Sequence, residues 1–390
     1  MYERLLKPIL FSIDPELVHE MAIATLEKLS HLRWLLDAVR RSGHEGSGKE
    51  LFGLHFPNPV GLAAGFDKNG IALPAWEALG FGFMEIGTIT ALTQVGNPRP
   101  RIFRVPEMEA LINRLGFNNQ GAEKIAIRLE ELRRSSHWPK IPVGLNIGKS
   151  KIVPLEEAVG DYLRSFQRLQ GLGDYFVLNV SSPNTPDLRK LQEKGAIGEL
   201  FEAIQRVNRS KPLLVKVAPD LTFAQLDDIL TLANQYRLAG IVATNTTTDQ
   251  QAVPEHQRQQ GGLSGKPLRA RSLEILRHLK KYSSLPVISV GGIMNEDDAK
   301  ERFDAGGMQL VFAVSAHVAK EQVAEGNAFD SRAYSRFACF HHDFLVVGVG
   351  ARLRQINIPQ RNASLFCLRL DEDTSHRVHG NPVRFLIERS

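Results

Sequence analysis

The chain has few of the features that mark several classes of protein. Its 390 residues include two cysteines, Cys339 and Cys367, which excludes a disulfide scaffold and a cysteine-based zinc site. No apolar run reaches the roughly 18–20 residues that a transmembrane helix needs, and the first residues lack the apolar core of a signal peptide. A net charge of +5, scattered along the chain, is too small to indicate a nucleic-acid binder. We therefore expect a cytoplasmic globular protein that at most contacts a membrane surface.

The first 45 residues favour helices. Asp14-Pro15 is a typical helix start, because aspartate accepts hydrogen bonds from free backbone N–H groups and proline has its φ preset. Four apolar residues then recur at helical spacing: Val18, Ala22, Leu26 and Leu29. A short apolar helix precedes them, over residues 5–13, and the small polar segment 42–48 predicts a linker. The residues alone fit a helix pair that caps the main domain, or one that lies in a membrane interface.

From residue 55 onward, short apolar runs alternate with helical segments. The runs are Val60–Gly65, Phe83–Thr88, Pro142–Ile147, Tyr175–Ser181, Leu213–Ala218, Gly240–Asn245, Pro286–Gly292 and Met308–Val314. The segments with helical periodicity are Glu123–Arg134, Leu155–Gln170, Ile197–Asn208, Phe223–Tyr236, Ala270–Tyr282 and Glu296–Ala305. Near-continuous apolar strands are typical of a parallel sheet that is buried on both faces. Eight strand–helix units fit a (β/α)8 TIM barrel better than an open sheet.

Polar residues stand at or near the carboxyl ends of successive predicted strands. They are Lys68, Thr88, Asn146, Asn179, Lys216 and Thr244. Polar groups in apolar strands are costly unless they bind something, and in a barrel these strand ends share one rim, where active sites form. The sequence therefore predicts a shared site at this rim.

The residue types at the rim indicate the ligand's chemistry. Two lysines supply positive charge, and five asparagines supply paired donors and acceptors: Asn113, Asn146, Asn179, Asn184 and Asn245. This set suits a flat heterocycle rich in C=O and N–H groups together with an anionic group. The rim has no cluster of His, Asp and Glu with metal-ligand spacing, so we expect no metal.

Two further segments carry chemistry. The loop Ser181–Pro186 presents hydroxyls beside amides, and no histidine stands near it in sequence, which leaves a serine-hydrolase triad without support. The segments Gly261–Gly265 and Gly291-Gly292 are rich in glycine, and the second directly follows the seventh strand. Barrels commonly bind phosphate there, so we expect a cofactor that bears phosphate.

Nine segments of the sequence resemble the class 2, quinone-dependent dihydroorotate dehydrogenases. The matching segments are Asn58–Gly70, Glu85–Thr90, Leu111–Gly121, Gly144–Lys149, Leu178–Arg189, Val215–Asp220, Ala243–Thr247, Gly261–Leu268 and Val290–Ile293. The resemblance implies oxidation of dihydroorotate to orotate in pyrimidine synthesis, with FMN as cofactor and a membrane quinone as final acceptor. It also implies a monomer on the cytoplasmic face of the cell membrane, with residues 1–45 forming the membrane contact and the quinone entrance.

The resemblance also assigns roles to residues. Ser182 would be the base that removes a proton from C5 of the substrate. Substrate binding is implied for Lys68, Asn113, Arg114, Leu115, Gly116, Phe117, Asn179, Asn184, Asn245 and Thr246. FMN binding is implied for Ala64, Gly65, Phe66, Asp67, Lys68, Thr88, Asn146, Asn179, Lys216, Thr244, Gly265 and Gly292.

From about residue 307, where the matching motifs end, the C-terminal part departs from this pattern. The family's eighth strand ends in a Tyr-Thr/Ser-Gly motif that grips the FMN phosphate, whereas this chain has Ala313-Val314-Ser315-Ala316. We expect an FMN-binding barrel over residues 46–312 and an anomalous tail over residues 313–390. The tail is rich in arginine and contains both cysteines, and we interpret it as the product of a shifted reading frame. Two alternatives follow: an impaired remnant of the enzyme, or another FMN-dependent barrel oxidoreductase.

Overall fold

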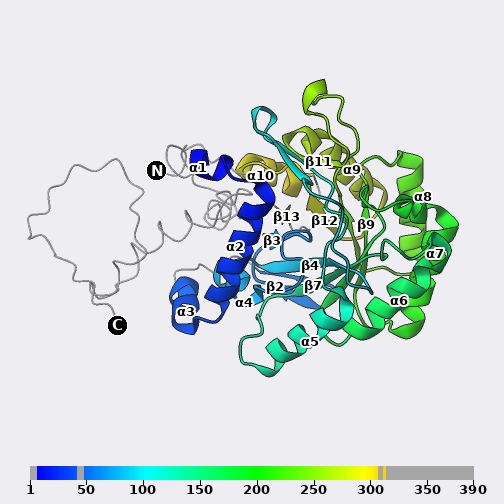
Figure 1. The fold of residues 1–390 in the computed structure, drawn as a ribbon. Helices are drawn as coiled ribbons and strands as arrows, with labels where there is room; N and C mark the ends of the chain where they lie inside the picture. The colour runs from blue at the N-terminus through cyan, green and yellow to red at the C-terminus, as the bar shows by residue number, and fades with distance from the viewer. Residues whose placement is uncertain (1–6, 42–47, 306–310, 313–390) are drawn as a thin grey trace, which may run out of the picture.

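Eight parallel strands form the centre of the protein. The computed structural model describes residues 7–41, 48–305 and 311–312. The strands, in their order around the sheet, are β3 (Gly61–Leu62), β4 (Phe83–Ile89), β7 (Val143–Ile147), β8 (Tyr175–Asn179), β9 (Leu213–Val217), β10 (Gly240–Ala243), β12 (Val287–Val290) and β13 (Val311–Phe312). The sheet curls until β13 contacts β3, as expected for a (β/α)8 barrel (Figure 1). Each of the eight predicted runs overlaps one of these strands, and seven contain the whole strand, whereas β4 extends one residue beyond its run.

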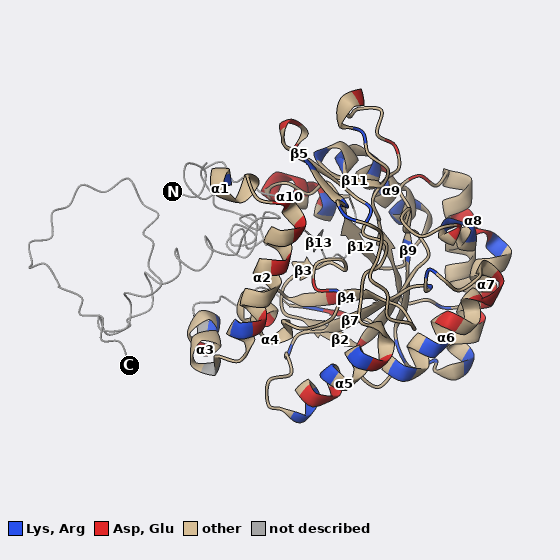
Figure 2. Cartoon of the chain, in the orientation of Figure 1, with Lys and Arg blue, Asp and Glu red and all other residues tan. Residues whose placement is uncertain are grey.

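Helices surround the strands on the outside. They are α4 (Leu73–Ala78), α5 (Gly121–Arg134), α6 (Ala158–Leu169), α7 (Lys194–Val207), α8 (Phe223–Gln235), α9 (Arg269–Tyr282) and α10 (Glu296–Asp304). Short 3-10 turns cover Pro106–Met108, Leu155–Glu157, Leu188–Gln192, Glu255–Gln257 and Lys266–Leu268. Helix α8 begins with a capping box between Thr222 and Gln225, which satisfies free N–H groups at its start. Charged residues gather on these outer helices, whereas the strands are nearly free of them (Figure 2).

The barrel interior is layered. Its lower layer is an apolar cluster that includes Phe83, Tyr175 and Leu214, closed from below by the hairpin β1 (Lys49–Leu51) and β2 (Leu54–Phe56). Because side chains alternate along a strand, Glu85 follows Phe83 on the inward face of β4, and Lys216 follows Leu214 on β9. A polar layer therefore lies directly above the apolar one, toward the carboxyl ends of the strands.

A second, antiparallel sheet lies above the barrel and was not predicted. It contains β5 (Ile102–Val105), β6 (Ala110–Asn113) and β11 (Gly262–Gly265). The glycine-rich segment 261–265 belongs to this sheet, because residues 262–265 pair with β6 along their length. Gly265 has φ +91°, and a Cβ there would lie 2.3 Å from the Glu109 carbonyl oxygen, so glycine is needed for this close pairing.

Three N-terminal helices pack on one side of the barrel: α1 (Lys7–Phe11), α2 (Pro15–Ser30) and α3 (Arg33–Arg41). Asp14 caps α2 as predicted, with Oδ1 accepting from the Glu16 and Leu17 N–H groups at 2.9 and 3.0 Å. Val18, Ala22 and Leu26 are buried. None of the helices in the described ranges is long and apolar enough to cross a membrane. The predicted linker, apart from Gly48, and the predicted tail 313–390 with its two cysteines lie outside the described residues.

Candidate active site at the carboxyl rim of the barrel

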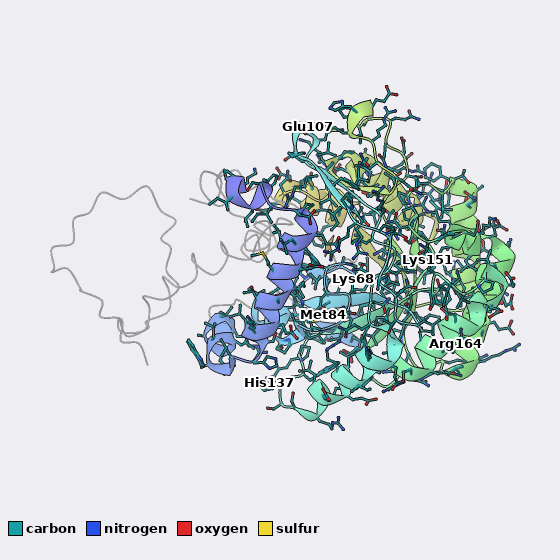
Figure 3. The ribbon with its side chains drawn as sticks, viewed as in Figure 1. Lys68, Met84, Glu107, His137, Lys151 and Arg164 are labelled. Carbon is teal, nitrogen blue, oxygen red and sulfur yellow. The ribbon has the colours of Figure 1, made fainter. Side chains whose placement is uncertain are left out.

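A cavity of about 290 Å³ opens at the carboxyl ends of the strands. Most of the predicted site residues line it: Ala64, Gly65, Phe66, Lys68, Thr88, Asn113, Leu115, Gly116, Phe117, Asn179, Ser182, Asn184, Lys216, Thr244, Asn245, Thr246, Gly265 and Gly292. They come from six strands or their following loops and from β6 and β11. Lys68 lies over the middle of the barrel in the view of Figure 3. The rim therefore gathers residues that are far apart in sequence into one site.

Three predicted residues lie behind the cavity wall. The Asp67 carboxylate accepts from the N–H groups of Ile71 and Ala72 and from the Trp76 indole, so it fixes the loop that carries Lys68. Arg114 points away, with Nε and Nη2 donating to the Pro100 carbonyl. Asn146 is fully buried beneath the cavity. These three side chains support the residues that line the cavity.

A chain of hydrogen bonds links the rim to the polar layer below. Asn179 Nδ2 donates to Thr88 Oγ1 at 2.8 Å, and Thr88 Oγ1 donates to Asn146 Oδ1 at 2.6 Å. Asn146 Nδ2 in turn donates to Glu85 Oε1 at 2.7 Å. At the other end, Asn245 Nδ2 contacts Asn179 Oδ1 at 3.3 Å. Satisfied buried amides of this kind are rigid, because breaking one bond leaves a buried polar group unpaired.

The loop after β8 brings Ser182 to the cavity. Ser182 is 5% exposed, and its Oγ accepts a hydrogen bond from the Asn184 N–H at 3.2 Å. Asn184 Nδ2 donates to the Asn113 carbonyl and side-chain oxygens at 3.1 and 3.2 Å. The serine loop is therefore held against β6, so that the second sheet and the barrel form opposite walls of one site.

Two lysines give the cavity a positive character. Lys216 Nζ lies 3.9 Å from Glu85 Oε1, and both side chains are buried. Burial raises the pKa of Glu85, while Lys216 and the hydrogen bond from Asn146 act in the opposite direction. Burial lowers the pKa of Lys68 to about 8, although the nearby Glu16 carboxylate opposes this shift. Lys68 can therefore change its charge near neutral pH.

Glycines open one wall of the cavity. Gly65 has φ +110°, and no atom lies within 4 Å of the position that a Cβ would take. Gly292, with φ +68°, approaches the Arg269 backbone so closely that a Cβ would lie 2.3 Å from the Arg269 Cα. Both positions leave backbone, without side chains, facing the cavity. This wall suits a planar ring and a phosphate group that must approach backbone closely.

The N-terminal helices contribute residues that the motifs did not identify. Lys7, Phe11, Pro15 and His19 line the outer part of the cavity. The position of a helix on a barrel depends on contacts between distant segments, so helical periodicity could not place these side chains. The arginines of β5 and of the segment before it could have indicated that another part of the chain packs here.

Two of those arginines attach the helices to the barrel. Arg101 binds the buried Glu16 carboxylate through Nε and Nη2 at 2.7–3.0 Å. Arg104 Nη1 donates to the Ile13 carbonyl at 2.9 Å, just beyond α1. The Glu16 carboxylate also opposes the lowering of the Lys68 pKa by burial. The ion pair that attaches the helices therefore also affects the charge of a cavity residue.

Comparisons with known proteins identify the family to which this chain is similar. Residues 48–324 match the family model described as dihydroorotate dehydrogenase, beyond the limit near residue 307 that the motifs suggested. A protein of Gloeobacter violaceus named dihydroorotate dehydrogenase (quinone) is 50% identical over 312 residues, which are 79% of this chain and 87% of the relative. A relative of the same name from Chloroflexus aurantiacus is 45% identical, covering 77% of this chain and 88% of its own.

A solved structure shares the fold. The ligand-free dihydroorotate dehydrogenase of Eimeria tenella is 35% identical, with a TM-score of 0.67 over 77% of this chain and 89% of the other. Fold, site geometry and relatives lead to one conclusion: the chain belongs to the dihydroorotate dehydrogenase family.

Proposed function

We propose that the chain oxidises dihydroorotate to orotate in pyrimidine synthesis and transfers the electrons through FMN to a quinone. The observation that carries the proposal is one cavity in which Ser182, Lys68 and several amides meet at the carboxyl ends of the strands. A dihydropyrimidine with a carboxylate and two ring amides matches these donors and acceptors. The shared name of the relatives supports the same activity and the quinone acceptor.

FMN is the cofactor that we propose for the glycine-lined wall. Gly65 leaves room for a flat ring, and Gly265 and Gly292 face the cavity with backbone alone. Lys216 supplies a fixed positive charge from below, which stabilises negative charge that develops above it. When bound, FMN supplies a flavin ring that accepts a hydride from the pyrimidine and passes electrons to the quinone.

The amide-rich part of the cavity holds the pyrimidine in this proposal. The Lys68 ammonium pairs with the substrate carboxylate, while amides from both sheets bind its ring carbonyl and N–H groups: Asn113, Asn179, Asn184 and Asn245. Leu115, Gly116 and Phe117 line the same part of the cavity and exclude water from the reacting atoms. The residues thus orient the ring with one face toward Ser182.

Ser182 is the base of the proposed mechanism. Its Oγ receives the proton that leaves C5 of the pyrimidine and releases its own hydroxyl proton to solvent. Pro183 and Pro186 stiffen the loop, and the hydrogen bond from the Asn184 N–H fixes the oxygen. The position of Ser182 is therefore set before substrate arrives.

The N-terminal helices form the proposed quinone entrance. Several of their apolar side chains are exposed: Ile9, Leu17, Met21 and Trp34. We propose that residues 1–45 rest on the cytoplasmic face of the membrane and that the chain acts as a monomer. A membrane quinone would then reach the cavity past Phe11, Pro15 and His19.

A coupled assay tests the proposed function. Purified full-length protein is given dihydroorotate and a short-chain quinone, and both orotate and the reduced quinone are measured. We expect equimolar formation of the two products. Absence of orotate from protein that carries bound FMN would contradict the substrate assignment and would favour another heterocycle for the same cavity.

A further inference from the structure

Glu85 is a buried carboxylate to which the proposed mechanism gives no role. It lies on β4, inside the barrel and beneath the cavity, with 1% of its surface exposed. Apart from Glu85 and Thr88, β4 consists of apolar residues and glycine. A buried charge is expensive unless it is paired and hydrogen-bonded, so its presence at this depth calls for a physical reason.

The partners of Glu85 fix the orientation of one amide. Asn146 Nδ2 donates to Glu85 Oε1 at 2.7 Å, and Lys216 Nζ lies 3.9 Å from the same oxygen. Burial raises the pKa of Glu85, whereas the Lys216 ammonium beside it and the hydrogen bond from Asn146 favour its carboxylate form. A carboxylate can only accept hydrogen bonds. The NH2 group of Asn146 must therefore face Glu85, and its carbonyl oxygen must face away.

This orientation is passed on to the cavity. Because Asn146 Oδ1 only accepts, the Thr88 hydroxyl must donate to it at 2.6 Å, and the Thr88 oxygen is left to accept from Asn179 Nδ2 at 2.8 Å. Asn179 Oδ1 then points the other way and accepts from Asn245 Nδ2 at 3.3 Å, from Ser181 Oγ at 3.0 Å and from the Ser181 backbone N–H at 3.3 Å. Glu85 and this backbone donor therefore hold the two ends of the chain in the same direction. Every donor in the chain points toward Glu85.

We propose that Glu85 is a positioning residue, whose carboxylate sets the direction of this hydrogen-bond chain and so fixes which amide groups Asn179 and Asn245 present to the bound pyrimidine. The identity of that ligand rests on the proposed function, whereas the direction of the chain does not. An amide that flips exchanges a donor for an acceptor, and a mismatched group on the heterocycle is then left unpaired at a cost in affinity. Glu85 thereby contributes to specificity without touching the ligand.

Two substitutions separate the acceptor from the charge. Glu85→Gln and Glu85→Leu both remove the negative charge opposite Lys216, but only Gln keeps an oxygen that accepts from Asn146. We expect the FMN-loaded E85L protein to bind orotate roughly tenfold more weakly than E85Q, as measured by calorimetry. Equal dissociation constants would overturn the proposal. Glu85→Met, with its adaptable side chain, provides the same comparison if E85L does not fold.

A double-mutant cycle tests whether the effect travels through the chain. Thr88→Val cuts the chain between Asn146 and Asn179, whereas Thr88→Ser keeps the hydroxyl and serves as its matched control. In the T88V background, E85L should cause little further loss of orotate affinity, because the link to Asn179 is already broken. Additive losses would show that Glu85 acts in another way.

A readout without pyrimidine keeps this inference separate from the proposed function. In full-length protein labelled with 15N-asparagine, hydrogen exchange reports the protection of the Asn146 and Asn179 side-chain NH2 groups. We expect slow exchange in the natural sequence and in E85Q, and faster exchange in E85L. Equal exchange in both variants would contradict the role of Glu85, whereas intact protection in a protein that binds no orotate would contradict only the proposed function.

Discussion

The barrel rim and the N-terminal helices form two sides of the same cavity in different ways. At the rim, Asn146 and Asn179 are almost fully buried and are tied to their neighbours by hydrogen bonds. On the helices, Ile9 is 59% exposed and Trp34 is 66% exposed, and attachment depends largely on contacts such as that of Glu16 with Arg101. We infer that the rigid barrel rim carries out the proposed chemistry. The N-terminal helices, which are attached through fewer contacts, control how the quinone reaches the cavity.

The largest effect is expected at Ser182. Replacing Ser182 with Ala removes the proposed base, so the rate of flavin reduction by dihydroorotate should fall by about 10²–10⁴-fold, while FMN stays bound. Stopped-flow absorbance measures this rate. Ser289→Ala is the matched control, because the buried Ser289 hydroxyl has no hydrogen-bond partner in the described part of the chain. Unchanged reduction in S182A would show that another group takes the proton.

A substitution of Glu16 tests whether the N-terminal helices and the barrel rim serve different half-reactions. Glu16→Gln leaves the buried Arg101 without its charged partner, which should lower the free energy of unfolding by about 3 kcal/mol. We expect quinone reduction to fall further than flavin reduction by dihydroorotate, which loses only the Glu16 charge near Lys68. Denaturant unfolding and the two half-reactions measure these effects. Glu20→Gln, which removes the exposed pairing of Glu20 with Arg99, should cost less than about 1 kcal/mol. Equal losses in both half-reactions would contradict the separation.

The lowered pKa of Lys68 predicts that the affinity for orotate depends on pH. With its pKa lowered to about 8 by burial, the ammonium loses its proton as pH rises through that value, and the affinity for the orotate anion should fall. Between pH 7 and pH 9 we expect the dissociation constant to rise about tenfold, because roughly one lysine in ten stays protonated at pH 9. Lys68→Met should bind weakly at every pH. A flat profile in the unaltered chain would exclude Lys68 as the carboxylate's partner.

The smallest effect concerns the membrane contact. Ile9→Ser and Trp34→Ser should each weaken binding to lipid vesicles severalfold, since each removes an exposed apolar side chain that would enter the interface. Flavin reduction should not change. Val207→Ser, on α7 across the barrel (Figure 1), is the control that should leave vesicle binding intact. If all three variants bind vesicles equally well, the helices are not the membrane contact.

The sequence predicts the barrel well because its local signals agree with the fold. The segment Phe223–Tyr236 shows helical periodicity, and α8 spans Phe223–Gln235. By contrast, β5, β6 and β11 were missed, because strands of four residues are too short to show a clear alternation, and β5 contains an arginine and β11 two glycines. The pairing of Gly265 with Ala110 joins positions 155 residues apart in the chain, which no local pattern can indicate.

The candidate site shows the same division. Polar ends on apolar strands indicated Lys216, Asn146 and Asn179 from sequence, whereas Glu85 was passed over although it is an acidic residue within a fully buried strand. An acidic residue within an apolar strand is the feature of the sequence that could have identified Glu85. The cavity residues of α1 and α2 could not be predicted, because they depend on how Arg101 and Arg104 hold the helices against the barrel.

The most direct test of the central claim is an anaerobic titration of the purified full-length chain with dihydroorotate, followed by flavin absorbance. The rim gathers Lys68, Ser182 and Lys216 around one cavity, so we predict equimolar bound FMN whose absorbance bleaches as orotate appears. Colourless protein that does not take up added FMN, or bound flavin that dihydroorotate does not bleach, would contradict the account.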